Sequence, residues 1–303
     1  MISKKKNEKK PKFAVLLAAK NGEKWINNQI LSILSQKNVE VKIFISIDRS
    51  YDRTEEICKK LAKSNSAIQI IKQNNFKRTS SSLNFFWLIK KVDLKKFDYI
   101  SLSDQDDIWF HNKLKRASMC LKKFNSYGYS SNVIALYEDG SQKKLLKNTK
   151  QTKFDFLFES AGAGSTYVIK TKEFNVVKEL IINKFNLVKK IENHDWFIYS
   201  CFRSMGYRWF IDKESTMFYR QHNSNVIGAN NSIKSGFKRL KMILSKWYSC
   251  QVNQNFKVIS FIADKNKIFD VNSKLDCIIN FYHLRRKFLH KVLLLILIIT
   301  RIY

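Results

Sequence analysis

The sequence has little proline, glycine or acid: one proline, eight glycines and 25 Asp and Glu among 303 residues. Its five cysteines are far apart and form no CxxC pair, which argues against a zinc site and a disulfide framework. Met1–Lys12 lacks the apolar core of a secretory signal, and the apolar run Val292–Ile299 is too short to span a bilayer. We therefore expect reduced thiols and a cytoplasmic location.

The scarcity of acidic residues leaves a strong positive charge. The chain has 56 Lys and Arg, which gives a formal net charge of +31. Such a charge favours an anionic partner: nucleic acid, anionic lipid or phosphate-bearing substrates. The 45% hydrophobic content is ample for the core of one large α/β domain.

Strand and helix patterns alternate from Phe13 onward. Short apolar runs predict strands, and helical spacing of apolar residues predicts helices between them. The predicted strands are Phe13–Ala19, Val41–Ile47, Ile68–Ile71 and Tyr99–Leu102. The predicted helices are Lys24–Gln36, Ser82–Lys90 and Asn112–Phe124, together with one that begins at a capping box, Asp52–Glu55. This order predicts a mainly parallel sheet with helices on both faces, and a ligand site at the carboxyl ends of the strands.

The second half of the chain is less regular. Residues 125–155 read as loops with at most an edge strand. Further on, we expect strands at Thr166–Ile169, Tyr207–Ile211 and Thr216–Tyr219, and helices at Thr171–Lys184 and Trp196–Phe202. Beyond about residue 231 the pattern is helical, basic and aromatic.

Three carboxylates follow the predicted strand Tyr99–Leu102, in the segment Asp104-Gln105-Asp106-Asp107. Carboxylates this close raise one another's pKa unless a cation lies among them. A calcium loop starting at Asp104 would need Gly at its sixth position and Glu at its twelfth, and these positions hold Trp109 and Lys115. The segment therefore predicts an Mg2+ or Mn2+ site that also binds substrate phosphates.

Three further candidates each have a structural alternative. Asp48 ends a predicted strand and either accepts hydrogen bonds from a base or ribose or caps the next helix. Asp195, after His194, is either a general base or a helix cap. Arg220 and His222 follow a strand and either face a diphosphate or belong to a solvated basic loop.

These segments occur together in an order typical of one family. They are Ala18-Ala19-Lys20-Asn21-Gly22-Glu23, Ile45–Thr54, Leu102-Ser103-Asp104-Gln105-Asp106-Asp107-Ile108-Trp109, His194-Asp195-Trp196, and Tyr219-Arg220-Gln221-His222 continuing to Gly228. With them, the chain resembles glycosyltransferase family 2, particularly its rhamnosyltransferase-like bacterial group, from about Phe13 to Gly228. It departs from the usual pattern at Lys20, Ile47 and Arg49.

The resemblance implies a GT-A fold, a nucleotide-diphosphate sugar donor and a divalent metal, Mn2+ or Mg2+. It implies that Asp104 and Asp106 bind the metal and that Asp195 is the catalytic base of an inverting transfer. It places donor binding at Ala19, Asn21, Glu23, Asp48, Asp104, Gln105, Arg220 and His222, and acceptor binding at Gly162, Gly164, His194 and Trp196.

The resemblance also divides the chain. Residues 1–11 form a basic disordered arm, 12–115 the nucleotide-sugar half, 116–230 the acceptor half of the same domain, and 231–303 a basic helical region. Within that region, residues 281–303 mix cations with aromatic and apolar residues, which suits either a helix at an anionic membrane surface or one packed on the domain.

The leading hypothesis is a glycosyltransferase of cell-surface polysaccharide synthesis, peripheral at the inner membrane face, with a saccharide or lipid-linked saccharide acceptor. One alternative is a basic nucleic-acid-binding protein, for which no helix-turn-helix, zinc-finger or RNA-recognition motif is present. The other is a homologue that binds a sugar nucleotide without turnover.

Overall fold

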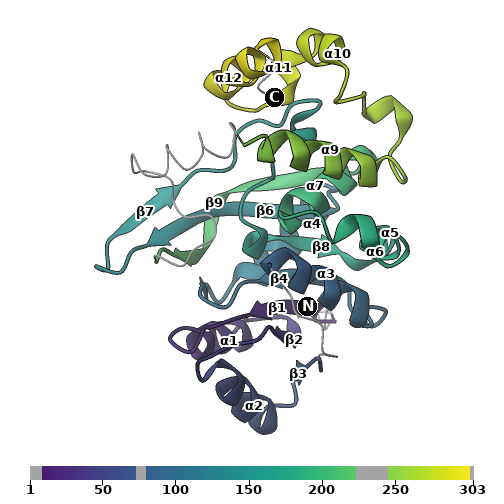
Figure 1. Ribbon diagram of the computed structural model, residues 1–303. Coiled ribbons are helices and arrows are strands. Elements are labelled where there is room, and N and C mark those ends of the chain that lie inside the picture. Colours follow the sequence, from purple (N-terminus) through teal and green to yellow (C-terminus); the bar gives the residue numbers. More distant parts are fainter. Residues whose placement is uncertain (1–8, 73–79, 223–244, 301–303) are drawn as a thin grey trace, which may run out of the picture.

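A computed structural model describes residues 9–72, 80–222 and 245–300 (Figure 1). One sheet runs through it in the order β3-β2-β1-β4-β8-β6-β9-β5, and β7 pairs with β6. The strands are β1 Lys12–Ala19, β2 Glu40–Ile47, β3 Ile68–Ile70, β4 Tyr99–Ser103, β5 Ile108–Trp109, β6 Gly128–Leu136, β7 Gln142–Leu145, β8 Val168–Lys170 and β9 Trp209–Arg220. The predicted α/β class is confirmed, and the motif Asn223–Gly228 lies outside the described residues.

Helices cover both faces of this sheet. They are α1 Ile26–Leu34, α2 Thr54–Ser64, α3 Ser81–Lys91, α4 Lys113–Lys123, α5 Thr171–Asn183, α6 Phe185–Val188, α7 His194–Ser204, α9 Trp247–Ile259, α10 Lys274–Ile279, α11 Phe281–Leu284 and α12 Phe288–Ile299. Successive residues of β1 enter different cores: Val15 packs with residues of α1, α2 and α4, and Leu16 with residues of α3, α5 and α7. This is why the strand is an unbroken apolar run.

Strand direction brings the polar strand ends together. β1, β2, β3 and β4 are mutually parallel, β8 is antiparallel to β4, β6 is antiparallel to β8, and β9 is parallel to β6. It follows that β1, β2, β4, β6 and β9 all point the same way. Their carboxyl ends therefore lie along one edge of the sheet, where ligands bind in folds of this type.

Two expectations for the second half were wrong. Residues 128–136 form the buried strand β6, which the polar run Ser130-Ser131-Asn132 disguises in the sequence. These side chains are paired inside the sheet: Ser130 Oγ donates to Ala161 O at 2.9 Å, and the amide of Asn132 donates to Lys213 O at 2.8 Å. The two strands expected at Tyr207–Ile211 and Thr216–Tyr219 are one strand, β9, because a register shift against β6 absorbs the polar residues between them.

The predicted capping box at Asp52–Glu55 was also wrong. Asp52 accepts a hydrogen bond from the Thr54 amide at 3.0 Å, but Glu55 pairs with Lys59 instead of reaching back to the helix start. The other carboxylate oxygen of Asp52 accepts from the Glu23 amide at 3.0 Å. Asp52 therefore ties the loop after β1 to the start of α2.

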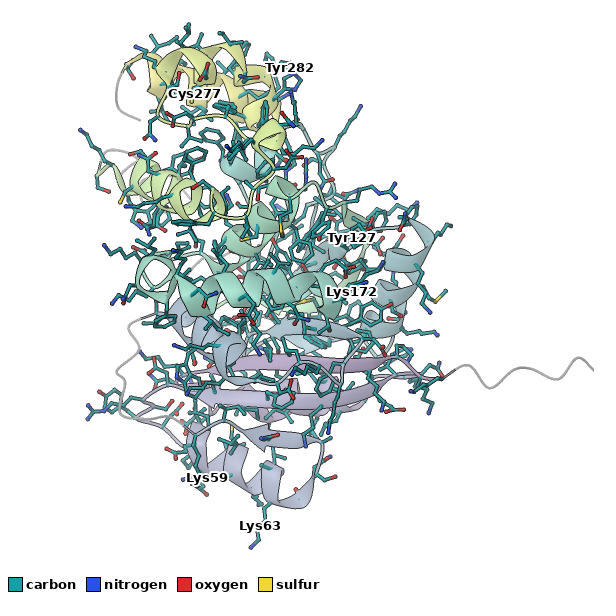
Figure 2. The ribbon with its side chains drawn as sticks, turned by 90° about the vertical axis from the view of Figure 1, so that its right-hand side faces the viewer. Lys59, Lys63, Tyr127, Lys172, Cys277 and Tyr282 are labelled. Atoms are coloured by element: carbon teal, nitrogen blue, oxygen red, sulfur yellow. The ribbon has the colours of Figure 1, made fainter. Side chains whose placement is uncertain are left out.

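The C-terminal helices α10, α11 and α12 stack at the end of the domain remote from α2, as Figure 2 shows with Tyr282 and Cys277 at one end and Lys59 and Lys63 at the other. The chain bends between α11 and α12, so the continuous helix considered for residues 281–299 is two helices. At the bend, Arg286 pairs with Glu159 at 3.3 Å and Asp155 at 3.6 Å. No helix in the described ranges is long and apolar enough to cross a membrane.

Candidate active site

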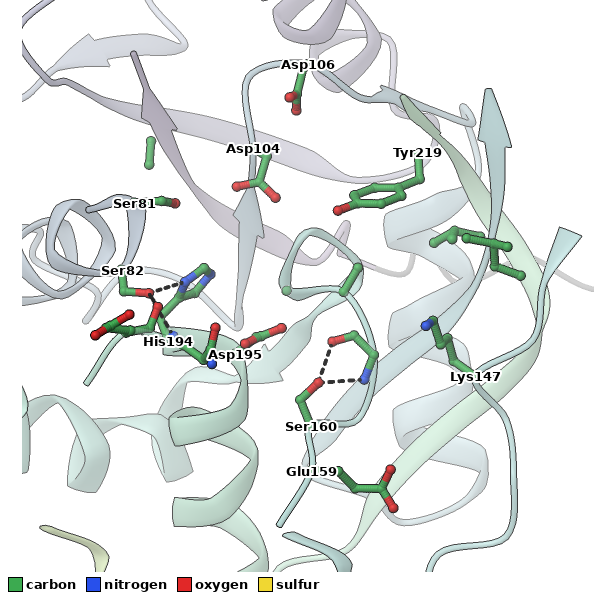
Figure 3. Close-up of a pocket in the computed structure, with 18 of the residues that line it drawn as sticks. Ser81, Ser82, Asp104, Asp106, Lys147, Glu159, Ser160, His194, Asp195 and Tyr219 are labelled. Carbon is green, nitrogen blue, oxygen red and sulfur yellow. Dashed lines mark hydrogen bonds between the residues drawn. The ribbon is translucent and has the colours of Figure 1, made fainter. Parts of the chain in front are cut away.

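A cavity of about 950 Å3 opens at the carboxyl edge of the sheet. Its walls come from the ends of β1, β2 and β4, the start of α3, the start of α7 and the loop of residues 159–164. Asp48, Asp104, Asp106 and Asp195 all line it. Figure 3 shows Asp104 between Asp106 and Asp195, with Tyr219 opposite.

The acidic loop after β4 is an electrostatically costly arrangement. Burial, then the charges of Asp106 and Asp195, raise the pKa of Asp104 to about 8. Asp106 Oδ2 lies 2.8 Å from Nε2 of His222, whose ring stacks on Trp25 with centroids 4.1 Å apart. His222 therefore contacts both Trp25 and Asp106 over the acidic loop, although each is more than a hundred residues away in the sequence.

The third carboxylate of the loop, Asp107, points away from the cavity. It is 1% exposed, and its Oδ1 accepts the Arg220 amide at 3.3 Å. Beneath it lies the fully buried Lys113, whose ammonium donates to Ser165 O at 2.8 Å and lies over the Trp109 ring. Asp107 therefore anchors the loop from below, while Asp104 and Asp106 line the cavity.

Residues of the loops after β1 and β2 line one side of the cavity. Asp48 follows β2 and receives the Arg49 amide at 2.8 Å. Asn21 is held by the Ser50 hydroxyl, which receives its amide at 3.0 Å, and lines the cavity beside Ala19. Gln105 lines the cavity too, yet its amide group is engaged with the backbone of Lys20 through Lys20 O at 2.7 Å. Gln105 therefore links the loop after β4 to the loop after β1, and its amide group is already bonded there.

The departures from the family pattern fall in different places. Ile47 is buried in the core beneath β2, and the guanidinium of Arg49 lies 5.3 Å from the Tyr51 ring centre. Neither lines the cavity, whereas Lys20 does, with its ammonium 3.5 Å from Asp48 Oδ2. Of these three departures, Lys20 is the one that changes the lining of the cavity.

Asp195 stands in the first turn of α7 on the other side of the cavity. Burial raises its pKa to about 6, although the Trp196 amide, donated at 2.7 Å, and the charge of Lys147 act in the opposite direction. Asp195 also has part of the role of a helix cap, because one of its carboxylate oxygens accepts the Trp196 amide in the first turn. The carboxylate still faces the cavity (Figure 3).

Its neighbour His194 is neutral, because burial lowers its pKa to about 3. The Ser82 hydroxyl donates to Glu192 O and receives the His194 amide at 3.0 Å. The contact of 3.2 Å between Ser82 Oγ and His194 Nδ1 is then donated by Nδ1. This leaves Nε2 as a bare acceptor, with no partner among the described residues, beside Gly164.

Three residues expected to contact substrates do not line the cavity, and we correct their assignment. Glu23 accepts the Arg53 amide at 3.0 Å and so holds the start of α2. Trp196 is 4% exposed and donates its indole N–H to Phe156 O at 2.8 Å. Arg220 donates from Nε to the backbone oxygen of Asp106 at 3.0 Å, which fixes the acidic loop from outside.

Other lining residues were missed in the sequence. Trp25 and Ser82 belong to no motif, and Tyr219 belongs to the motif that ends at His222 but was given no role; all three line the cavity. Lys144, Lys147, Lys287 and His290 also line the cavity. That residues of β7 and of α12 line one cavity cannot be read from positions this far apart.

Comparison with known proteins decides the family. Residues 14–212 match the profile described as Glycosyl transferase family 2. The chain belongs to glycosyl transferase family 2, and it is a glycosyltransferase. It is 42% identical over 292 residues to the dTDP-rhamnosyl transferase RfbG of Shigella flexneri, a match that covers 95% of this chain and 100% of that protein.

Solved structures agree on the fold. S. aureus TarS 1-349 in complex with UDP-GlcNAc has a TM-score of 0.53 at 13% identity, covering 90% of this chain and 81% of that one. The chain spans 46% of a longer TarS structure. The mannosyltransferase PcManGT from Pyrobaculum calidifontis, in complex with GDP-Man and Mn2+, has a TM-score of 0.51 at 11% identity, covering 97% of this chain and 87% of that one. These likenesses establish the GT-A fold predicted for this family 2 enzyme.

The space at Gly164 gives a direct test of the site. A Cβ at this position would lie 2.9 Å from His194 Nε2 and 3.1 Å from Asp195 Cβ, so Gly164→Ala must displace the start of α7. We expect sugar transfer to fall at least about tenfold, since small displacements of reacting groups are costly, while binding of the nucleotide sugar stays within about twofold. Ser66→Ala, at an exposed position that does not line the cavity, is the control. Unchanged transfer by Gly164→Ala would show that this wall of the cavity is not used.

Proposed function

We propose that this glycosyltransferase moves a rhamnosyl group from dTDP-rhamnose to a saccharide acceptor, in an inverting and metal-dependent reaction of cell-surface polysaccharide synthesis. The donor is inferred from the 42% identity to the dTDP-rhamnosyl transferase RfbG over nearly the whole chain. The observation that carries the chemistry is the meeting of Asp48, Asp104, Asp106 and Asp195 in one cavity.

The metal proposal rests on Asp104 and Asp106. No group of three His, Cys, Asp or Glu side chains arranged as a metal site occurs among the described residues. Two carboxylates nevertheless fit a divalent ion whose other ligands are diphosphate oxygens and water. The raised pKa of Asp104 supports this, because a cation between the carboxylates would relieve their repulsion. Mn2+ or Mg2+ held there would stabilise the negative charge of the leaving diphosphate.

Asp195 is the proposed base. As the acceptor hydroxyl oxygen forms a bond to the anomeric carbon, the bond from that carbon to the diphosphate oxygen breaks. The hydroxyl proton passes to the Asp195 carboxylate, and dTDP leaves with the electron pair. The bare Nε2 of His194 is suited to accept a hydrogen bond from the acceptor and to orient it.

The alternative of binding without turnover rested on Ile47 and Arg49. Both lie outside the cavity, so neither change removes a group that the reaction needs. This placement favours an active enzyme.

Loss of the acidic ligand should abolish the reaction. We expect Asp106→Ala to lower the transfer rate at least about a hundredfold, because charge on the leaving group is no longer stabilised. Thermal-shift binding with Mn2+ should show stabilisation of the native protein by dTDP-rhamnose over UDP-glucose, UDP-galactose and UDP-GlcNAc, and loss of that stabilisation in Asp106→Ala. Asp139→Asn, on an exposed turn, is the control. Full transfer activity in Asp106→Ala would refute the metal role.

The pH dependence of sugar transfer tests whether Asp195 is the base. Only the ionised carboxylate accepts a proton, so transfer should be constant above pH 7 and fall about tenfold per unit below a pKa of about 6. The Lys147 charge lowers that pKa, so Lys147→Met should move the limb to higher pH, while the exposed Lys150→Met should not. The assignment of Asp195 as the base would be contradicted if transfer by the wild-type enzyme fell only near pH 4. It would also be contradicted if the pH of that fall were the same in Lys147→Met.

We also propose that α12 rests on an anionic membrane surface. Leu294 and Ile298 face the domain, and Leu289, Leu293 and Ile296 are about half exposed or more on the opposite side (75%, 48% and 50%). A helix apolar on both sides suits contact with an interface, and the net charge of +31 favours anionic lipid. Arg285 and Arg286, which lie within the segment 281–303, face Glu159.

Binding to lipid vesicles tests the proposed membrane contact of α12. We expect the protein to sediment with vesicles that contain phosphatidylglycerol and not with pure phosphatidylcholine, and Leu289→Glu/Leu293→Glu to weaken binding at least about tenfold. The control is Met119→Glu, a 58% exposed apolar residue on α4. Equal sedimentation of the double variant would eliminate α12 as the contact.

A further inference from the structure

We propose that Lys113 is a positioning residue for sugar transfer, because it joins the loop of the proposed metal ligands to the wall of the cavity at Asp195. This inference rests on the proposed function and adds a residue to its machinery. Lys113 is the first residue of α4, is fully buried and does not line the cavity. Any effect of Lys113 on transfer therefore acts through the residues around it.

A fully buried ammonium is costly, because it has left the water that would solvate its charge. Burial lowers the pKa of Lys113 to about 7, although the charge of Asp107 acts in the opposite direction. The ammonium nitrogen lies 3.9 Å from the centre of the Trp109 ring and donates to the backbone oxygen of Ser165 at 2.8 Å. Two segments therefore hold this cation: the acidic loop with β5, which follows it, and the short 3-10 helix Gly164–Thr166.

The 3-10 helix leads directly to the proposed base. Ser165, which accepts from Lys113, follows Gly164 in the chain, and the Gly164 oxygen accepts the Tyr167 amide at 2.8 Å. A Cβ at Gly164 would lie 3.1 Å from Asp195 Cβ, so this glycine packs against the start of α7. A displacement of Ser165 is therefore passed through Gly164 to Asp195.

The acidic loop leads to the proposed metal ligands. Asp107 directly follows Asp106 and is 1% exposed. Burial, then the charges of Asp106 and Asp104, raise the pKa of Asp107 well above its usual value. The Ser165 hydroxyl acts in the opposite direction, so the 3-10 helix lies against the acidic loop. The two segments meet at Asp107 and Lys113, and neither of these residues lines the cavity.

The contact matters because transfer needs both segments at once. The acidic loop would hold the metal and diphosphate, and therefore the anomeric carbon, while Asp195 would hold the attacking hydroxyl (Figure 3). A small misplacement of two reacting groups lowers the rate strongly. Donor binding needs the acidic loop alone. Loss of the Lys113 bridge should therefore lower kcat and leave the KM for the donor almost unchanged.

The test compares two variants that share a neutral residue at position 107. Asp107→Asn keeps Lys113, whereas Lys113→Met/Asp107→Asn removes the ammonium without leaving a buried carboxylate unpaired. We expect similar Tm values for the two, and a kcat at least about tenfold lower in the double variant with the KM for dTDP-rhamnose within about twofold. Both constants are measured with Mn2+ as release of dTDP, which accompanies transfer of the sugar to an acceptor or to water.

Hydrogen exchange supplies a readout that needs no donor. In the double variant, the backbone amides of residues 163–167 should exchange at least about tenfold faster than in Asp107→Asn, because the Ser165 oxygen has lost its donor. Lys291→Met is the matched control. Lys291 is 6% exposed, lies 3.6 Å from the centre of the Tyr282 ring and does not line the cavity. It should change neither kcat nor this exchange.

Equal kcat in Asp107→Asn and the double variant would overturn the proposal, as would equal exchange of residues 163–167. A double variant that does not fold, or that changes kcat and KM in parallel, would assign Lys113 to stability alone and overturn it too. Failure of the native protein to turn over dTDP-rhamnose would instead refute the proposed donor, and it would leave the exchange measurement standing.

Discussion

Repulsion among carboxylates at the end of β4 is the constraint on which the rest of the site depends. Asp104, Asp106 and Asp107 occupy one turn, and burial with the charges of Asp106 and Asp195 raises the pKa of Asp104 to about 8. Polar groups from outside the loop bond to its carboxylates. His222 contacts Asp106, and Lys113 lies under Asp107. The remaining excess of negative charge faces the cavity, where a metal–diphosphate complex would neutralise it.

The same principle of paired charge organises the opposite end of the molecule. Asp155 and Glu159 are buried carboxylates, and arginines from α7 and from the bend before α12 neutralise them. Removing one partner of such a buried pair typically costs about 3–5 kcal/mol, so the C-terminal helices are held firmly.

Much of the site was predictable because its residues follow strands. A parallel strand carries its next polar residue to a known edge of the sheet, so Asp48, Asp104 and Asp106 were expected together. The prediction of substrate contact failed for residues whose type can either bind a ligand or stabilise the fold. Glu23 and Trp196 belong to the right motifs, yet their polar groups bond backbone atoms. Strand β6 was missed because its polar side chains find partners only in the folded protein, Ser130 in a loop at Ala161 and Asn132 in β9 at Lys213.

The sequence by itself determined the family, the alternation of strands and helices, and the acidic turn, because these depend on local spacing and on rare residue types. Only the tertiary structure decided which groups face the cavity. It buried Asp107 beside the Arg220 amide, left His194 Nε2 without a partner among the described residues, and placed Lys287 and Lys147 in the lining of one cavity. Those outcomes depend on contacts between segments a hundred or more residues apart, and no local pattern encodes such contacts.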